Sequence, residues 1–174
     1  MRMLKLAVAA ATLFAFGITS ALAITAQKRR EAPGTPAEIW EIVGDFCAIK
    51  SWHPAVAECV ETKEGDVVFR TLTLQDGAKI KEKLTGTDGT SYSYEIVESP
   101  LPVKNYTSKL WIVEDDEDDR IAIYWKSEFD AEGASDEDAK KTITGILNDG
   151  VAGIKKAALD HSDKKEGMVD DDDD

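Results

Sequence analysis

Apolar residues recur every three or four positions along the stretch from residue 135 to residue 160. This spacing stacks side chains on one face of an α-helix, and Ser135 followed by three acidic residues is typical of a helix start. The predicted apolar face comprises Ile143, Ile146, Leu147, Val151, Ile154 and Ala158. Gly145, Gly150 and Gly153 each weaken a helix by roughly 1 kcal/mol, so we expect close neighbours that require their small size.

The residues before this helix predict a β-sheet on which the helix can pack, because apolar and polar positions alternate in six consecutive segments. These segments are 56–62, 66–74, 78–86, 91–98, 105–114 and 120–129. Asp76-Gly77, Asp88-Gly89 and the acidic residues 115–119 separate neighbouring segments as short turns. Short turns join antiparallel strands, and residues 24–32 add an extended segment at the edge. We therefore predict a seven-stranded antiparallel sheet.

Two short helices are predicted between the first and second strands. Thr35 and Glu38 form a capping-box pattern with proline at the first helical position, so one helix spans residues 36–44. Asp45 is expected to cap a second helix, which Pro54 ends. Together, two small helices, a curved sheet and a long closing helix predict an α+β fold.

Strand alternation also predicts which side chains face the core. The inward rows are Ile80, Glu82 and Leu84; Tyr92, Tyr94 and Ile96; Tyr106, Ser108, Leu110 and Ile112; and Ile121, Ile123, Trp125 and Phe129. Residues 66–74 allow two registers, with either Val68, Arg70, Leu72 and Leu74 or Val67, Phe69, Thr71 and Thr73 facing inward. A strict two-residue hairpin at Asp76-Gly77 favours the second register, but we select the register with Arg70 inside.

The inward rows are too polar for a sealed apolar core, because a buried charge needs a partner or water. Either Arg70 and Glu82 form an ion pair on neighbouring strands, or they line a wet cavity beneath the helix. A cavity with apolar walls and a few convergent polar groups is typical of a small-molecule site. The candidate ligand-binding residues are His53, Arg70, Glu82, Tyr94, Tyr106, Ser108 and Trp125.

A histidine can titrate near neutrality, so His53 is the candidate acid, base or hydrogen-bond donor. The alternative is a surface or packing role for this lone histidine. As an enzyme, the protein would use His53 with Glu82 as an acid–base pair. The sequence has no nucleophile beside a base, no glycine-rich phosphate loop and no metal-ligand spacing, so we predict no cofactor or metal. Cys47 and Cys59 allow two interpretations, a disulfide or two buried thiols.

Residues 1–23 are predicted to be a cleaved signal peptide, with a basic start, a short apolar core and the small-residue cleavage pattern Ala21-Leu22-Ala23. We therefore expect a periplasmic protein, with a domain over residues 24–162, a disordered acidic tail over 163–174 and no membrane segment after cleavage. The formal net charge of -13 becomes more negative by two when Arg2 and Lys5 leave. Such acidity argues against nucleic acid or an anionic membrane as partner, and favours either a basic protein partner or simple solubility. The acidic runs 114–119 and 170–174 are accordingly either solvated charge that keeps the protein soluble or a surface that steers a basic partner.

The segments 37–46, 52–54 and 101–106, together with Arg70 and Glu82, resemble the START-like, polyketide-cyclase/dehydrase-like superfamily (SRPBCC). The resemblance covers about residues 25–160 and implies the helix-grip fold. Plant abscisic acid receptors belong to the same superfamily, and the resemblance places His53 where they have the lysine that meets the ligand carboxylate. His53 departs from their pattern, because a neutral imidazole is a poorer partner for a carboxylate. It also implies pocket positions at Arg70, Glu82, Tyr106 and Ser108.

Among exported members of the superfamily, the chain resembles the MxaD-type periplasmic proteins of bacterial methanol oxidation. That resemblance implies an accessory role between methanol dehydrogenase, a basic partner, and its cytochrome. Our main hypothesis is a non-enzymatic periplasmic protein that binds a small apolar or amphipathic ligand. The alternatives are a cyclase- or dehydratase-like enzyme and an interaction module with a filled core.

Overall fold

The computed structural model describes residues 22–115 and 120–169. Its elements in chain order are β1 (Ile24–Pro33), α1 (Pro36–Val43), α2 (Ile49–Trp52), β2 (Val56–Glu64), β3 (Val67–Leu74), β4 (Lys79–Thr87), β5 (Ser91–Glu98), β6 (Val103–Asp115), β7 (Arg120–Ala131) and α3 (Asp136–Val169). The predicted elements are all present. β5 has the predicted bounds, and the other strands differ from prediction by a few residues at their ends.

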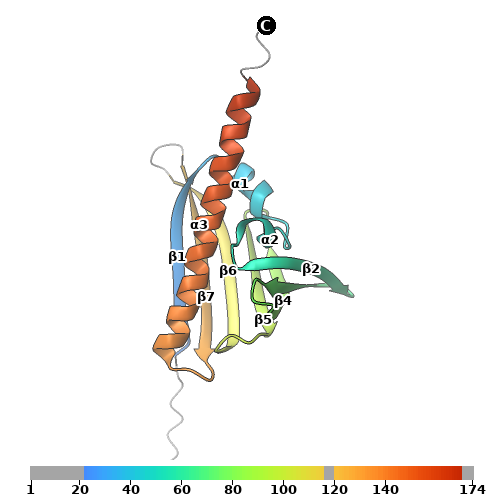
Figure 1. The fold of residues 1–174 in the computed structure, drawn as a ribbon, viewed down its shortest axis with the longest axis vertical. Helices are drawn as coiled ribbons and strands as arrows, with labels where there is room; N and C mark the ends of the chain where they lie inside the picture. Colours follow the sequence, from blue (N-terminus) through green and yellow to red (C-terminus); the bar gives the residue numbers. More distant parts are fainter. Residues whose placement is uncertain (1–21, 116–119, 170–174) are drawn as a thin grey trace, which may run out of the picture.

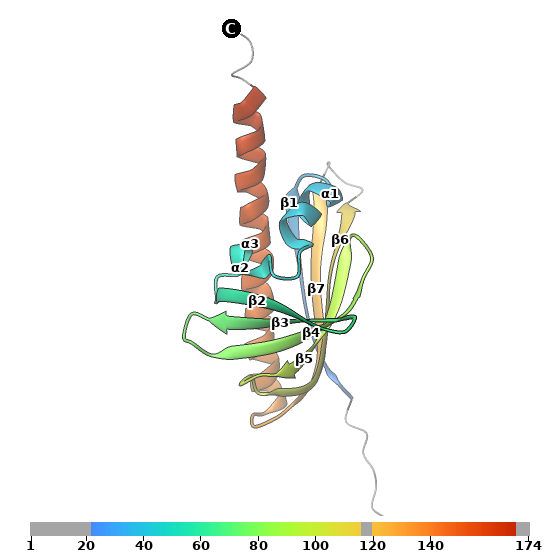
Figure 2. The ribbon, with the colours of Figure 1, turned by 90° about the vertical axis from the view of Figure 1, so that its right-hand side faces the viewer.

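The strands form one antiparallel sheet in the order β1-β7-β6-β5-β4-β3-β2. The sheet curves around α3, and α1 and α2 lie at one end of the molecule's concave side (Figures 1 and 2). This is the predicted helix-grip arrangement, with a seven-stranded sheet, a long C-terminal helix and two short helices after the first strand. Because the sheet is curved, the inward side chains converge beneath α3.

The helix starts follow the predicted capping in two cases and depart from it in one. Thr35 and Glu38 form the capping box of α1, and the Ser135 hydroxyl accepts a 3.1 Å hydrogen bond from the Asp138 N–H at the start of α3. The prediction that Asp45 caps α2 was wrong. The Asp45 carboxylate accepts from the Cys47 N–H at 2.8 Å and forms a local turn, so α2 begins only after Ala48.

Helix α3 buries the predicted apolar face, with Ile146 half-buried and the other five residues fully buried. A Cβ added at Gly153 would lie 1.8 Å from the Trp52 carbonyl oxygen, and one at Gly150 would lie 2.1 Å from the Trp125 ring. These two glycines therefore permit the close packing we expected, whereas no atom lies within 4 Å of a Cβ at Gly145. The helix continues to Val169 and extends beyond the sheet (Figure 1), so residues 163–169 are helical rather than disordered.

The register between β3 and β4 places Arg70 inside, as predicted. Leu72 pairs with Ile80, and the Leu74 N–H donates to the Ala78 carbonyl oxygen at 2.8 Å. Three residues therefore form the turn, and the last of them, Gly77, has a φ of +86°. A left-handed glycine at this place is typical of a three-residue hairpin, which explains why the two-residue alternative was wrong.

Several sequence-based predictions fall outside the described residues. The predicted signal peptide covers residues 1–23, of which only 22 and 23 are described. β1 starts at Ile24. The hairpin-tip residues 116–119 and the aspartates 170–174 are likewise not described. Within the described ranges, the structure contains no helix with the length and apolarity that a bilayer crossing requires.

Candidate functional site

A small cavity lies between the concave face of the sheet and α3, and we call it the inner cavity. Its volume is about 60 Å³. It is lined by Ile49, His53, Ala55, Val56, Leu72, Leu74, Ile80, Glu82, Tyr94, Ile96, Leu101, Tyr106, Trp125, Ile143 and Ile146. Five of the seven predicted ligand-binding residues therefore meet here. Arg70 and Ser108 do not line the cavity. Each is hydrogen-bonded to a residue that does, Arg70 to Glu82 and Ser108 to Trp125.

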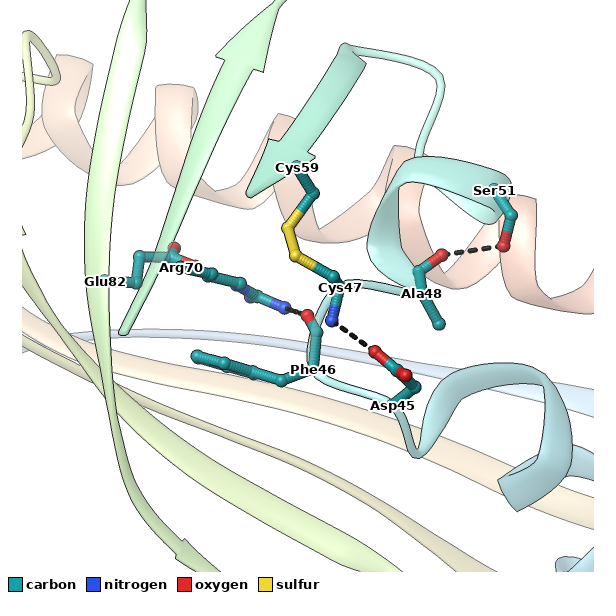
Figure 3. Close-up of a disulfide and its surroundings, with 8 residues drawn as sticks. All are labelled: Asp45, Phe46, Cys47, Ala48, Ser51, Cys59, Arg70 and Glu82. Atoms are coloured by element: carbon teal, nitrogen blue, oxygen red, sulfur yellow. Dashed lines mark hydrogen bonds and ion pairs between the residues drawn. A yellow bond between two sulfur atoms is a disulfide. The ribbon is translucent and has the colours of Figure 1, made fainter. Parts of the chain in front are cut away.

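Arg70 and Glu82 are cross-strand partners and form a buried ion pair. The Arg70 Nε atom donates to the Glu82 Oε2 atom at 2.5 Å, and the two residues are 0% and 5% exposed. Arg70 also donates through Nη1 to the Phe46 carbonyl oxygen, and its Cζ atom lies 3.9 Å from the centre of the Phe46 ring (Figure 3). Of the two alternatives left open by the sequence, the structure contains the ion pair, and Glu82 also borders the inner cavity.

The charges of this pair depend on each other. Burial raises the pKa of the Glu82 carboxyl, and the adjacent Arg70 charge acts in the opposite direction. Burial tends to lower the pKa of Arg70, but Glu82, Tyr92 and Tyr94 together outweigh this effect and raise the pKa above its usual value. An arginine does not deprotonate in proteins, and a neutral Glu82 would leave its charge uncompensated. We therefore assign the pair as ionised. The positive charge of Arg70 compensates the negative charge of Glu82.

The hydroxyl groups of the inward rows bond to one another. The Trp125 Nε1–H donates to the Ser108 Oγ atom at 3.0 Å and to the Tyr94 hydroxyl at 3.2 Å. The Ser127 Oγ atom lies 2.9 Å from Ser108 Oγ and 2.7 Å from the Tyr106 hydroxyl. Burial raises the pKa of both tyrosines, so the hydroxyls stay protonated. This network positions the cavity walls and holds Ser108 away from the cavity.

His53 is buried, with 4% exposure, and both ring nitrogens are hydrogen-bonded. Its Nδ1 atom accepts from the Ala55 N–H at 3.2 Å, and its Nε2 atom lies 3.1 Å from the Ile146 carbonyl oxygen. These partners assign a neutral ring protonated at Nε2. Burial is the main cause that lowers the pKa of His53; the Ile146 carbonyl and Asp149 raise it, and the Arg70 charge lowers it further. His53 is therefore a neutral link between the α2–β2 turn and α3.

The cysteines form a disulfide, which decides between the two interpretations left open by the sequence. Cys47 and Cys59 have Cα atoms 5.5 Å apart and join the segment before α2 to β2. Figure 3 shows the disulfide beside Phe46, whose carbonyl oxygen receives the Arg70 hydrogen bond. The crosslink thus anchors the main chain that completes the surroundings of the buried guanidinium.

Sequence reasoning missed Ser127, the Phe46 carbonyl and the apolar residues that enclose the cavity. Ser127 lies at an inward position of β7, between Trp125 and Phe129, so strict alternation was a signal for it. The Phe46 contact uses a main-chain atom, which no side-chain pattern indicates. The apolar lining was visible as core residues, but nothing in the chain indicated which core residues border a void.

The size and lining of the inner cavity limit what it can hold. Typical sites for drug-sized ligands measure about 300–1,000 Å³, so a volume of about 60 Å³ suits a few carbon atoms. His53 and Glu82 both line the inner cavity, but the histidine bonds to main-chain atoms and the glutamate to Arg70. In the described part of the chain, no group of three or more His, Cys, Asp or Glu side chains is placed to hold a metal ion.

Comparison with known proteins identifies relatives of this fold. The family described as "Polyketide cyclase / dehydrase and lipid transport" matches residues 23–159. The protein XoxI from Bacillus cereus has a similar structure, with a TM-score of 0.74 and 29% identity over 79% of this chain and 97% of that chain. No curated protein matches the chain at a significant level.

Two more distant structures share the fold. A START superfamily protein from Mycobacterium smegmatis gives a TM-score of 0.65 at 12% identity, over 78% of this chain and 97% of that chain. The di-domain aromatase/cyclase StfQ from the steffimycin biosynthetic pathway gives 0.64 at 13% identity, over 81% of this chain and 52% of that chain. This chain therefore spans about half of StfQ, and both similarities concern the fold alone.

Proposed function

The chain belongs to the polyketide cyclase/dehydrase and lipid transport family, and we propose that it binds a small, uncharged and mostly apolar molecule in the inner cavity without transforming it. The observation that carries this proposal is the chemistry of the cavity wall. Eleven of the fifteen residues around it are aliphatic or tryptophan side chains, and the four others, His53, Glu82, Tyr94 and Tyr106, have protein partners. An ionic ligand would find no unpaired charge among them.

Native mass spectrometry of the protein isolated from its source compartment tests this proposal. We expect a bound species that is released unchanged on denaturation and that rebinds to the emptied protein. Leu101→Phe is the matched variant, because Leu101 is half-buried at the cavity wall and a larger ring there occupies the void. A molecule retained equally by wild type and Leu101→Phe would mean that binding occurs elsewhere.

We further propose that the protein acts in the periplasm as an accessory protein of methanol oxidation, assisting contact between methanol dehydrogenase and its cytochrome. Support comes from the resemblance to the MxaD-type proteins, from the N-terminal leader pattern and from the net charge of -13, which suits a basic partner. Stopped-flow measurement of cytochrome reduction by the dehydrogenase tests this role. The protein should accelerate reduction at low salt and lose its effect as salt screens the charges; an unchanged rate at low salt would contradict it.

The enzymatic alternative, with His53 and Glu82 as acid and base, has weaker support. Both residues border the same cavity, as acid–base chemistry requires. However, neither His53 ring nitrogen is directed to an unoccupied position, and the Glu82 carboxylate is bound to Arg70. Turnover of a ligand that is lost in His53→Gln, with binding retained, would favour the enzyme over the binding protein.

A further inference from the structure

A second hollow lies on the other side of His53, and we call it the outer groove. It is open to solvent, measures about 470 Å³ and lies between the α2–β2 junction and α3. It is lined by Lys50, Ser51, Trp52, His53, Pro54, Val56, Gln75, Asp149, Ala152, Gly153, Lys156, Ala157 and Asp160. Its lining shares two residues with that of the inner cavity, His53 and Val56. These two side chains therefore form the partition between the two spaces.

The two hollows follow one another along α3. The inner cavity is bordered by Ile143 and Ile146 of this helix, and the outer groove by residues from Asp149 onward. Figures 1 and 2 place α2 and the start of β2 beside the middle of α3. His53 and Val56, which border both hollows, lie at this junction of α2 and β2. A molecule that leaves the outer groove between His53 and Val56 would thus arrive directly in the inner cavity.

The main chain beside the partition is held too tightly against α3 to move aside easily. A Cβ at Gly153 would lie 1.8 Å from the Trp52 carbonyl oxygen, so main chain and helix are already in contact there. The partition itself is attached more weakly. In the described part of the chain, one hydrogen bond joins residues 49–56 to α3, from His53 Nε2 to the Ile146 carbonyl. The side chains of His53 and Val56 are therefore the movable parts.

From this arrangement we propose that the outer groove is the access route to the inner cavity, with His53 and Val56 as its gate. The inference rests on the proposed binding function and adds to it the path that the ligand takes. An uncharged apolar molecule first lodges beside Trp52 and Pro54 in the groove. It passes inward when the hydrogen bonds of His53 to the Ile146 carbonyl and the Ala55 N–H open and the imidazole turns away from α3. The bonds then close behind it.

One rival route exists at the opposite side of the inner cavity. A hollow of about 400 Å³ between the end of β5 and the start of β6 shares Ile96 and Tyr106 with the inner cavity. Tyr106 is restrained there by its 2.7 Å hydrogen bond to Ser127 and by stacking on Phe129, with ring centres 6.0 Å apart. Opening this side requires the loss of both contacts. The gate at His53 requires the loss of its hydrogen bonds to Ile146 and Ala55 and of its edge-on contact with the Trp125 ring. Both openings therefore break specific contacts, and the variants below distinguish the two routes.

Xenon is a suitable probe, because it is apolar and binds in small dry cavities. Saturation-transfer NMR of dissolved xenon gives the association rate constant for the full-length mature protein. Ala152→Trp fills the outer groove without touching the inner cavity, and we expect it to lower that rate at least tenfold. Lys141→Trp, at an exposed position of α3 that lines neither hollow, is the matched control and should leave it unchanged. Val56→Ala should raise the rate at least fivefold.

The outcomes separate this inference from the binding function on which it rests. Binding of xenon with an association rate unaffected by Ala152→Trp and Val56→Ala would overturn the access route and leave the cavity intact. A tenfold slower rate in Val97→Trp, which blocks the rival hollow, combined with a normal rate in Ala152→Trp, would assign access to the β5–β6 side. Failure of the wild-type protein to bind xenon would overturn both proposals.

Discussion

Replacing Glu82 by alanine removes the counter-charge of an arginine that has no access to water. Arg70 is 0% exposed, and Glu82 is the one carboxylate within ion-pair distance of it among the described residues. In the variant, the guanidinium keeps its hydrogen bond to the Phe46 carbonyl and its contact with the Phe46 ring. Breaking a buried pair by removing one partner typically costs about 3–5 kcal/mol. We expect a loss of this size in the free energy of unfolding.

Chemical and thermal denaturation measure this loss. For a domain of this size, each kcal/mol lowers the melting temperature by roughly 2–4 °C, so we expect a decrease of about 6–20 °C. Glu95→Ala is the matched control, because Glu95 of β5 pairs with Lys83 of the neighbouring strand β4 at 2.8 Å, with both side chains more than a third exposed. An exposed pair contributes about 0–1 kcal/mol.

Two results would decide the reasoning about this pair. Equal, small losses in Glu82→Ala and Glu95→Ala would refute it, since they would mean that water reaches Arg70 and compensates its charge. The double variant Arg70→Met with Glu82→Leu supplies a second test. Because apolar residues of similar volume often replace a buried ion pair at little cost, this variant should be more stable than Glu82→Ala although it carries one substitution more.

Three further predictions concern contacts around the same site. Gly153→Ala should destabilise the protein by about 1–3 kcal/mol, because its Cβ meets the Trp52 carbonyl, whereas Gly145→Ala should stabilise it by up to about 1 kcal/mol; equal melting temperatures would contradict this. Replacing Cys47 and Cys59 by serine should cost about 2–4 kcal/mol, and reductant should lower the melting temperature of wild type but not of this variant. The folded state lowers the pKa of His53, so below about pH 6.5 the unfolded chain binds the proton more readily than the folded protein does. The free energy of unfolding therefore decreases as the pH is lowered. This loss between pH 7.5 and 5 should be smaller in His53→Gln, and an identical loss in the two proteins would mean that His53 is not the group responsible.

Local patterns in the sequence were enough to derive the architecture. Alternation with period two identified the strands and their inward rows, and three- and four-residue steps identified α3. Each period arises because the side chains on the buried face of a strand or helix recur at the repeat of that element. The capping of α1 and α3 was equally local, as it uses side chains within three residues of each other. Alternation also placed Arg70 and Glu82 on inward rows of neighbouring strands, but the choice between an ion pair and a wet cavity stayed open until the structure showed the pair.

The tertiary structure decided what depends on contacts between distant segments. Cys47 and Cys59 form a disulfide because the turn before α2 packs on β2, a relation that spacing alone left open. Sequence placed His53 in a ligand site but did not indicate that Ile146 and Ala55 occupy its ring nitrogens. The volume of the inner cavity was also undetermined. It is the small difference between the space enclosed by the curved sheet and α3 and the volume of the side chains that fill this space. Local patterns therefore specify which residues face inward, and only three-dimensional packing specifies how much space remains among them.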